Sequence, residues 1–186
     1  MGTFKDSNAY QNKDKMLTQH QAALSVFQGK LENPEVSDLN WLDLACGRGQ
    51  ILMNLDSNFG EELINKINYS AFDLKNDYLT QTLRQAETLK FKNVQGKIGD
   101  IINFPILFPE QQKFDFITLI NSIHELNPYD LPILFFETIL RLSTTGIFYL
   151  YDMETLTNRE LGAVSWKADE INRVIKTFLI SSSSFF

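Results

Sequence analysis

Four short segments of this 186-residue sequence carry acidic, amide or glycine residues at the ends of stretches that are typical of β-strands. They include Asp43, Asp73, Asp100 and Asn121. Carboxylate and amide groups bind hydroxyl and amine groups of a ligand through hydrogen bonds. Because the carboxyl ends of parallel strands meet at one edge of a sheet, we expect these side chains to converge on one ligand.

The first segment runs Leu42-Asp43-Leu44-Ala45-Cys46-Gly47-Arg48-Gly49. Glycines allow a tight turn and the close approach of a ligand to the backbone. The dinucleotide-binding pattern Gly-x-Gly-x-x-Gly is not met, because the third position after Gly49 is Leu52. An acid inside the strand is costly to bury unless it is paired or binds something, which makes Asp43 a candidate binding residue.

Two further acids have the spacing of a nucleoside site. Asp73 lies 24 residues after Gly49, at a strand end where a carboxylate can accept hydrogen bonds from two ribose hydroxyls. Asp100 is followed by Ile101, so an acceptor for an adenine amine stands beside an apolar side chain. Each also has a simpler interpretation: Asp100 as a helix cap or Asx turn, and Asp73 as a solvent-exposed carboxylate.

A polar cluster, Asn121 to Leu126, follows the strongest strand prediction and contains His124 and Glu125. A histidine in such a place is more often a hydrogen-bonded packing residue than a catalyst. The pair resembles the start of a zinc-protease helix, but the second histidine would fall at Pro128, which excludes that site. Cys46, the single cysteine, is expected to be a small buried thiol.

The elements that must position these residues alternate between helix and strand. Helices are predicted over 14–31, 50–55, 76–91 and 129–142, with a last one from about 157 to 179 that is broken near Trp166. Strands are predicted over 41–45, 69–73, 94–98, 114–120 and 146–151. This alternation, with apolar rather than alternating strands, predicts an α/β fold: a doubly wound, mostly parallel sheet of about five strands flanked by helices.

Composition narrows the function. The chain carries 17 Lys and Arg against 23 Asp and Glu, a net charge of −6, which argues against binding to nucleic acid. One cysteine and two histidines argue against a disulfide framework and against a metal site. The first 15 residues are polar, with no apolar leader, and no run could span a membrane. These features favour a cytoplasmic protein.

The ordered set at the strand ends resembles the Rossmann-like, class I S-adenosylmethionine-dependent methyltransferases, over roughly residues 14–179. The resemblance implies S-adenosylmethionine as cofactor. It also implies a binding set made of Asp43, Ala45, Cys46, Gly47, Gly49, Asp73, Leu74, Asp100, Ile101 and Asn121. Ala45 stands where the family usually has glycine. No catalytic residue is assigned, because the activated sulfonium needs no dedicated base; His124, Glu125 and Tyr10 are the candidates if one exists.

The resemblance divides the chain into an N-terminal lid and helix (1–36), a cofactor-binding core (37–152), a C-terminal helix (153–180) and an irregular tail (181–186). The family's sheet normally continues with an antiparallel hairpin after the last helix. This sequence stops at that helix, so we expect a domain truncated before the hairpin, without the last two strands. The strand over 146–151 is then an exposed sheet edge, which invites pairing with another chain.

Three functions follow from this sequence. The first is methyl transfer to a small-molecule or protein acceptor. The second is a non-catalytic or partner-dependent methyltransferase-like domain, completed by a dimer or partner at the exposed edge. The third is a nicotinamide-dependent oxidoreductase, which the failed glycine pattern argues against.

Overall fold

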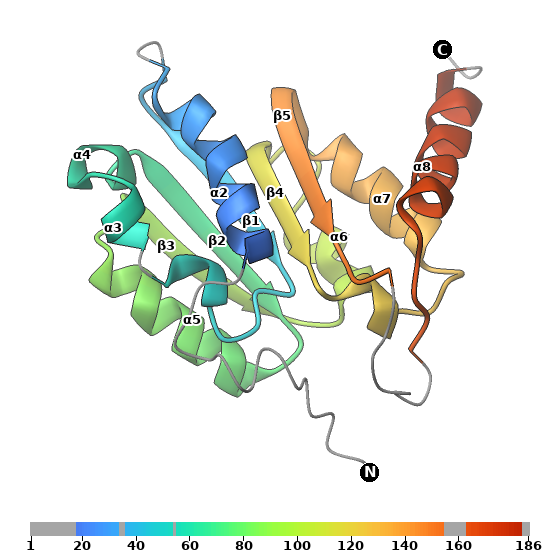
Figure 1. Ribbon diagram of the computed structural model, residues 1–186, viewed down its shortest axis with the longest axis horizontal. Helices are drawn as coiled ribbons and strands as arrows, with labels where there is room; N and C mark the ends of the chain where they lie inside the picture. Colours follow the sequence, from blue (N-terminus) through green and yellow to red (C-terminus); the bar gives the residue numbers. More distant parts are fainter. Residues whose placement is uncertain (1–17, 34–35, 54, 155–162, 184–186) are drawn as a thin grey trace.

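A five-stranded sheet forms the centre of the described structure. The computed structural model describes residues 18–33, 36–53, 55–154 and 163–183 (Figure 1). All strand pairings in this part of the chain are parallel, which confirms the predicted fold class. The strands are β1 (Leu39–Leu44), β2 (Ile67–Asp73), β3 (Asn93–Ile98), β4 (Phe114–Ile120) and β5 (Leu142–Tyr151).

The strand order β3-β2-β1-β4-β5 contains one reversal of direction. The chain winds from β1 outward to β3, then crosses back to place β4 on the other side of β1. The gap between the ends of β1 and β4 is therefore the topological switch point, where ligands bind in sheets of this kind.

One face of the sheet packs against α2 (Thr18–Leu31) and α5 (Asn76–Thr88). Ala23, Leu24 and Phe27 of α2 meet the inward side chains of the strands, including Trp41 and Phe116. Phe27 stacks on Phe116 with ring centroids 4.6 Å apart. The segment between β1 and β2, with α3 (Leu55–Asn58) and α4 (Glu61–Ile64), adds Leu55 and Ile64 to the same cluster.

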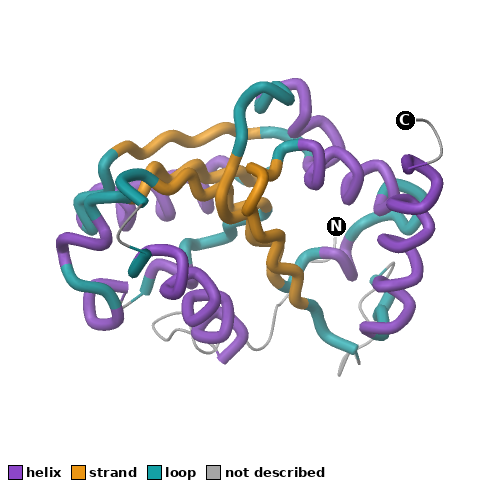
Figure 2. Tube along the Cα trace, turned by 90° about the horizontal axis from the view of Figure 1, so that it is seen from above, coloured by secondary structure: helices purple, strands orange, loops and turns teal. Residues whose placement is uncertain are grey.

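The opposite face packs against α6 (Phe104–Leu107), α7 (Leu131–Leu140) and α8 (Ala168–Ser183). Figure 2 shows helices on both sides of the strand layer. The contacts come from Phe104, Leu134, Phe135 and Ile171. Since both faces are covered, the central strands β1, β2 and β4 are buried almost throughout, as their uninterrupted apolar sequences indicate.

Several boundaries differ from the prediction. The helix expected over 50–55 is only a 3-10 turn, η1 (Gln50–Leu52), followed by the short helix α3. β5 begins at Leu142 rather than Gly146, because it pairs with β4 through a register shift. Consequently α7 is shorter than predicted, since residues 141–142 belong to the turn and the strand. α8 continues to Ser183, so the first residues of the predicted irregular tail are helical.

Parts of several predictions lie outside the described residues. They include the start of the first helix, at residues 14–17, and the start of the last helix, predicted at about residue 157. The described part of the last helix begins at Ala168, directly after the predicted break near Trp166.

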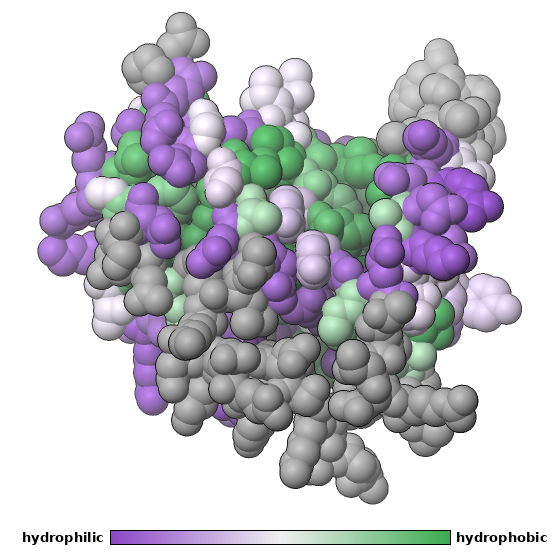
Figure 3. Space-filling model, in the orientation of Figure 1, coloured by the Kyte–Doolittle hydropathy of each residue, from purple (hydrophilic) through white to green (hydrophobic). Residues whose placement is uncertain are grey.

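β5 forms one edge of the sheet in the described residues, paired with β4 only. Figure 3 shows hydrophobic side chains gathered on the front face between α2 and α8, over these two strands. Ile147 and Tyr149 of β5 are partly buried, at the border of the first core cluster. None of the helices in the described ranges is both long enough and apolar enough to cross a membrane.

Candidate functional site

A cavity of about 600 Å³ lies at the carboxyl ends of the strands. It is lined by nine of the ten residues predicted to bind a ligand: Asp43, Ala45, Cys46, Gly47, Asp73, Leu74, Asp100, Ile101 and Asn121. The tenth, Gly49, does not line it. Residues separated by up to 78 positions in the sequence therefore meet at one site, as the parallel topology requires.

The loop after β1 has an unusual backbone. Ala45, Gly47 and Gly49 all have positive φ values, of 53°, 55° and 74°. Glycine adopts this region without cost, whereas alanine is strained there by about 1–2 kcal/mol. The resemblance implies glycine at this position, and the strain at Ala45 is the cost of having alanine there instead.

Helix α5 holds this loop from outside the cavity. A side chain at Gly49 would collide with the Gln85 amide and lie 3.1 Å from Thr82 Oγ1. Thr82 Oγ1 donates to the Gly47 carbonyl at 2.9 Å. The Gln85 amide nitrogen, oriented toward the loop, donates to the carbonyls of Arg48 and Gly49. Gly49 therefore serves the packing of the loop on α5, which explains why it does not face the cavity.

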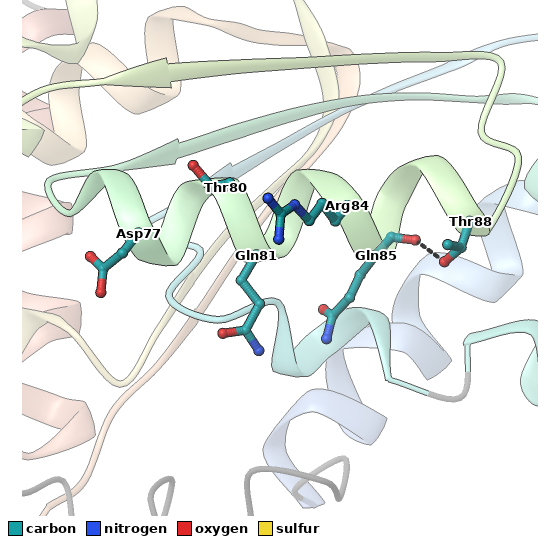
Figure 4. Close-up of a pocket in the computed structure, with 6 residues that line it drawn as sticks. All are labelled: Asp77, Thr80, Gln81, Arg84, Gln85 and Thr88. Carbon is teal, nitrogen blue, oxygen red and sulfur yellow. Dashed lines mark hydrogen bonds between the residues drawn. The ribbon is translucent and has the colours of Figure 1, made fainter.

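Figure 4 shows the hollow on the outer side of α5, where Gln81 and Gln85 extend from the helix. All six of its lining residues come from this one helix: Asp77, Thr80, Gln81, Arg84, Gln85 and Thr88. Gln81 accepts a hydrogen bond from Arg48 of the glycine loop, N to O 3.4 Å. The two glutamines thus support the loop.

Asp73 ends β2 and is 7% exposed. Its Oδ2 accepts from the Gly47 amide and its Oδ1 from the Lys75 amide, both at 2.8 Å. Burial raises the pKa of this carboxyl, and the two amide donors oppose the shift. A carboxylate has about four acceptor positions, so roughly two remain for hydroxyl groups of a ligand in the cavity.

Asp43 lies beneath the glycine loop and is 4% exposed. Tyr69 Oη donates to one carboxylate oxygen at 2.8 Å and Thr118 Oγ1 donates to the other at 2.7 Å. Thr118 in turn accepts from Trp41 Nε1. Burial raises the pKa of Asp43 to about 6. The acid inside the strand is therefore paired, by hydroxyls of β2 and β4 that the sequence did not single out.

The end of β3 combines a cap with the cavity wall. The Asp100 carboxylate accepts from the Ile102 amide at 3.2 Å and caps the 3-10 turn η2 (Ile101–Asn103). Asp100 and Ile101 both line the cavity, as does Leu74, which is 64% exposed. The two interpretations of Asp100 from sequence are thus compatible, since capping occupies one of its oxygens.

Asn121 follows β4 with a φ of 54°, in the left-handed region that asparagine adopts more readily than most residues. Its backbone amide donates to the Tyr151 carbonyl at the end of β5. Its side-chain Oδ1 is buried and has no hydrogen-bond partner. A buried oxygen without a partner at a cavity wall is suited to a ligand donor.

Sequence reasoning missed several residues of the cavity, which fall into two groups. Arg48 and Lys75 both lie over the Tyr78 ring, at 4.4 Å and 4.7 Å from its centroid, and all three line the cavity. His20 comes from α2, far from the strand-end motifs. Arg48, Lys75 and Tyr78 follow strand ends and could have been found by the same rule, whereas nothing local marks His20.

The cluster after β4 separates into two groups. Glu125 lines the cavity, but His124 does not. His124 Nδ1 hydrogen-bonds to Asp152 Oδ1 at 2.6 Å, and the His124 amide donates to Asp152 Oδ2. His124 is therefore a buried packing residue that joins the ends of β4 and β5, which is the role that the sequence analysis favoured. Tyr10 lies outside the described residues.

Cys46 is 8% exposed, and burial raises the pKa of its thiol well above the ordinary value. A protonated, buried thiol is a poor nucleophile, so Cys46 acts as a small wall residue. Within the described residues, no group of three or more His, Cys, Asp or Glu side chains could hold a metal ion.

The comparisons with known proteins agree with the fold. A family model described as a methyltransferase domain matches residues 35–178. No curated protein matches the sequence. A solved structure from Pyrococcus horikoshii OT3 has a TM-score of 0.63 at 18% identity, and the alignment covers 94% of this chain and 90% of that one.

Two further structures are described as S-adenosylmethionine-dependent methyltransferases. One is from Clostridium acetobutylicum, with a TM-score of 0.55, 23% identity and 77% of this chain covered. This chain spans 53% of that protein's length. The other is from Leishmania major, with a TM-score of 0.64, 15% identity and coverage of 86% of this chain and 62% of that one.

The family model covers most of the chain, and it includes every strand of the sheet and every residue of the predicted binding set. The solved structures share the parallel sheet with its flanking helices. The chain therefore belongs to the methyltransferase-domain family and has the Rossmann-like fold of class I S-adenosylmethionine-dependent methyltransferases.

Proposed function

We propose that this protein transfers the methyl group of S-adenosylmethionine to a small-molecule or protein acceptor. The observation that carries the proposal is the cavity itself. Nine of the residues predicted to bind the cofactor line this cavity, at the topological switch point of a sheet that belongs to the methyltransferase-domain family. S-adenosylmethionine, when bound, supplies a methyl group on a sulfonium that is already activated for in-line displacement.

The donor set of the cavity fits this cofactor. Asp73 keeps acceptor positions for two ribose hydroxyls after bonding the Gly47 and Lys75 amides. Asp100 supplies an acceptor for the adenine amine, beside the apolar side chains of Ile101 and Leu74. The Asn121 oxygen, buried without a partner, can accept from the cofactor's ammonium group. Ala45, Cys46 and Gly47 form the wall against the remaining part, with Asp43 beneath them.

The contribution of the protein is alignment rather than acid–base chemistry. Gln85 and Thr82 fix the glycine loop, and Asp73 ties that loop to the end of β2. A wall held in this way places two reactants in line, which can supply several kcal/mol of the barrier reduction. Of the two catalytic candidates that the structure describes, Glu125 lines the cavity, whereas His124 is held by Asp152 and does not line it.

The test is a calorimetric titration with S-adenosylhomocysteine, the demethylated product, which binds without reacting. The proposal expects saturable binding of one ligand per chain. A folded protein that binds none would refute the proposal. Once binding is established, production of S-adenosylhomocysteine from S-adenosylmethionine, measured over a panel of small molecules and peptides, identifies the acceptor.

A second candidate function follows from the edge of the sheet. β5 pairs with β4 alone in the described part of the chain, and apolar side chains gather over these strands (Figure 3). We propose that a second copy or a partner strand adds to this edge. Light scattering after size-exclusion chromatography is the measurement; a monodisperse monomer at high micromolar concentration would contradict self-pairing.

A further inference from the structure

His20 is a buried polar residue without a hydrogen-bond partner at Nδ1. Only 6% of the residue is exposed. In the described part of the chain, three buried side-chain polar atoms have no partner, and two of them, His20 Nδ1 and Asn121 Oδ1, belong to residues that line the same cavity. A folded protein rarely leaves such groups unpaired, so a partner is expected to arrive with a ligand.

The place of His20 in the fold indicates which part of a ligand it meets. His20 lies in the first turn of α2, which packs against η1 and β4. Figure 1 shows this turn close to the end of the sheet toward which β4 and β5 point. In the strand order, β1 and β4 lie on one side of β2, and β3, with Asp100 at its end, lies on the other. His20 is thus placed opposite the proposed adenine end.

We propose that His20 Nδ1 forms a hydrogen bond with the amino-acid end of the bound cofactor. This inference rests on the proposed function, because it requires the adenine at Asp100 and the ribose at Asp73. A ligand that extends along the strand ends from β3 to β4 then brings its methionine part to the corner between the glycine loop, Asn121 and α2.

The chemistry of the imidazole suits this partner. Burial lowers the pKa of His20 to about 4, so the ring is neutral near pH 7. A neutral imidazole donates from one nitrogen and accepts at the other, depending on the tautomer. The amino-acid end of the cofactor has both a carboxylate acceptor and an ammonium donor, and either satisfies Nδ1. Among the described residues no protein group, Asp43 of the same cavity included, forms a hydrogen bond with Nδ1.

The experiment compares two ligands that share adenosine and differ in the amino-acid part. S-adenosylhomocysteine carries the amino acid, whereas 5′-methylthioadenosine lacks it. For His20→Phe, which keeps a ring of similar size without nitrogen, we expect the Kd of S-adenosylhomocysteine to rise about tenfold or more. The Kd of 5′-methylthioadenosine should stay within about twofold of the wild-type value. His20→Gln, which keeps a polar group, should recover part of the loss.

Gln21→Ala, one position along on the exposed side of α2, is the matched control and should bind both ligands like the wild type. Thermal unfolding of each variant checks that the fold is kept, and His20→Ala replaces His20→Phe if the larger ring disturbs packing. An equal loss for both ligands, or no loss for either, would overturn the role of His20 while the cofactor site stands. A wild-type protein that binds neither ligand would refute the proposed function and this inference together.

Discussion

Two buried carboxylates at strand ends, Asp73 after β2 and Asp152 after β5, have different surroundings. Asp73 bonds two backbone amides and lines the cavity. Asp152, with a side chain only 3% exposed, bonds the His124 ring and the amides of His124 and Met153, and does not line the cavity. Both follow a strand of the same parallel sheet, yet they face different partners.

The comparison teaches that position at a strand end is not enough to make a binding residue. What matters is whether acceptor positions remain after the protein's own donors have been counted, and whether they face a cavity. Asp73 meets both conditions. Asp152 bonds His124 and so holds the ends of β4 and β5 together. Its role is therefore structural.

The largest expected effect is on stability, from Asp152→Ala. Removing this carboxylate leaves the buried His124 ring and two amides without their acceptor, so the free energy of unfolding should fall by about 3 kcal/mol. Chemical denaturation measures the change. At a temperature where the variant is folded, its affinity for S-adenosylhomocysteine should stay close to that of the wild type.

Asp152→Asn is the matched variant, since it keeps one acceptor and should lose less stability than Asp152→Ala. If either variant lost ligand affinity while remaining folded, the distinction between a binding role for Asp73 and a structural role for Asp152 would be wrong.

The second prediction concerns ligand affinity rather than stability: Asp73→Ala should lose binding. The variant removes the proposed acceptor of the ribose hydroxyls and also the bond that fixes the Gly47 amide. We expect the Kd of S-adenosylhomocysteine to rise about 100-fold or more, equivalent to roughly 3 kcal/mol. Isothermal titration calorimetry gives this value directly.

Asp77→Ala controls for the loss of a nearby acid, because Asp77 lies in the first turn of α5 and does not line the cavity. Undiminished binding by Asp73→Ala would show that Asp73 is not part of the cofactor site.

A third prediction concerns pH and Asp43, whose pKa burial raises from 3.8 to about 6. Between about pH 4 and pH 6 the folded protein keeps a proton that the unfolded chain has released, so stability falls as pH rises through this window. The fall attributable to Asp43 is on the order of 3 kcal/mol. In Asp43→Asn this contribution disappears, and the melting temperature should drop less between pH 4 and pH 7 than in the wild type.

Burial also raises the pKa of Asp73, and its contribution has the same sign. Subtracting the pH profile of the variant from that of the wild type therefore isolates Asp43. Parallel profiles for the two proteins would show that Asp43 is ionised across the whole range.

The smallest effect is expected from Ala45→Gly. Glycine removes the strain of a φ of 53°, but it also increases the entropy of the unfolded chain. The net gain in stability should be at most about 1 kcal/mol. Thermal unfolding measures it, with Ala45→Val as the opposite case, because a β-branched residue fits this region least well. Stabilisation by valine would contradict the strained loop.

The sequence was sufficient for the fold class and for nine of the residues that line the cavity. Strands such as 114–120 were predictable because a sheet covered on both faces needs uninterrupted apolar residues. The positions of Asp73 and Asp100 then followed from the rule that ligands bind beyond the carboxyl ends of parallel strands. These features are local in sequence, or repeat with a known period.

Other features were decided by the tertiary structure alone. The bond between His124 and Asp152 joins residues 28 positions apart, and Gly49 contacts Thr82 and Gln85 of α5 rather than the cavity. His20 reaches the cavity only because α2 packs on one face of the sheet with its first turn near the strand ends (Figure 1). Each depends on the packing of elements distant in sequence. The local sequence determines the backbone conformation of a segment and which of its side chains face the core. The hydrogen-bond partners of a side chain are determined only when elements distant in sequence pack against it.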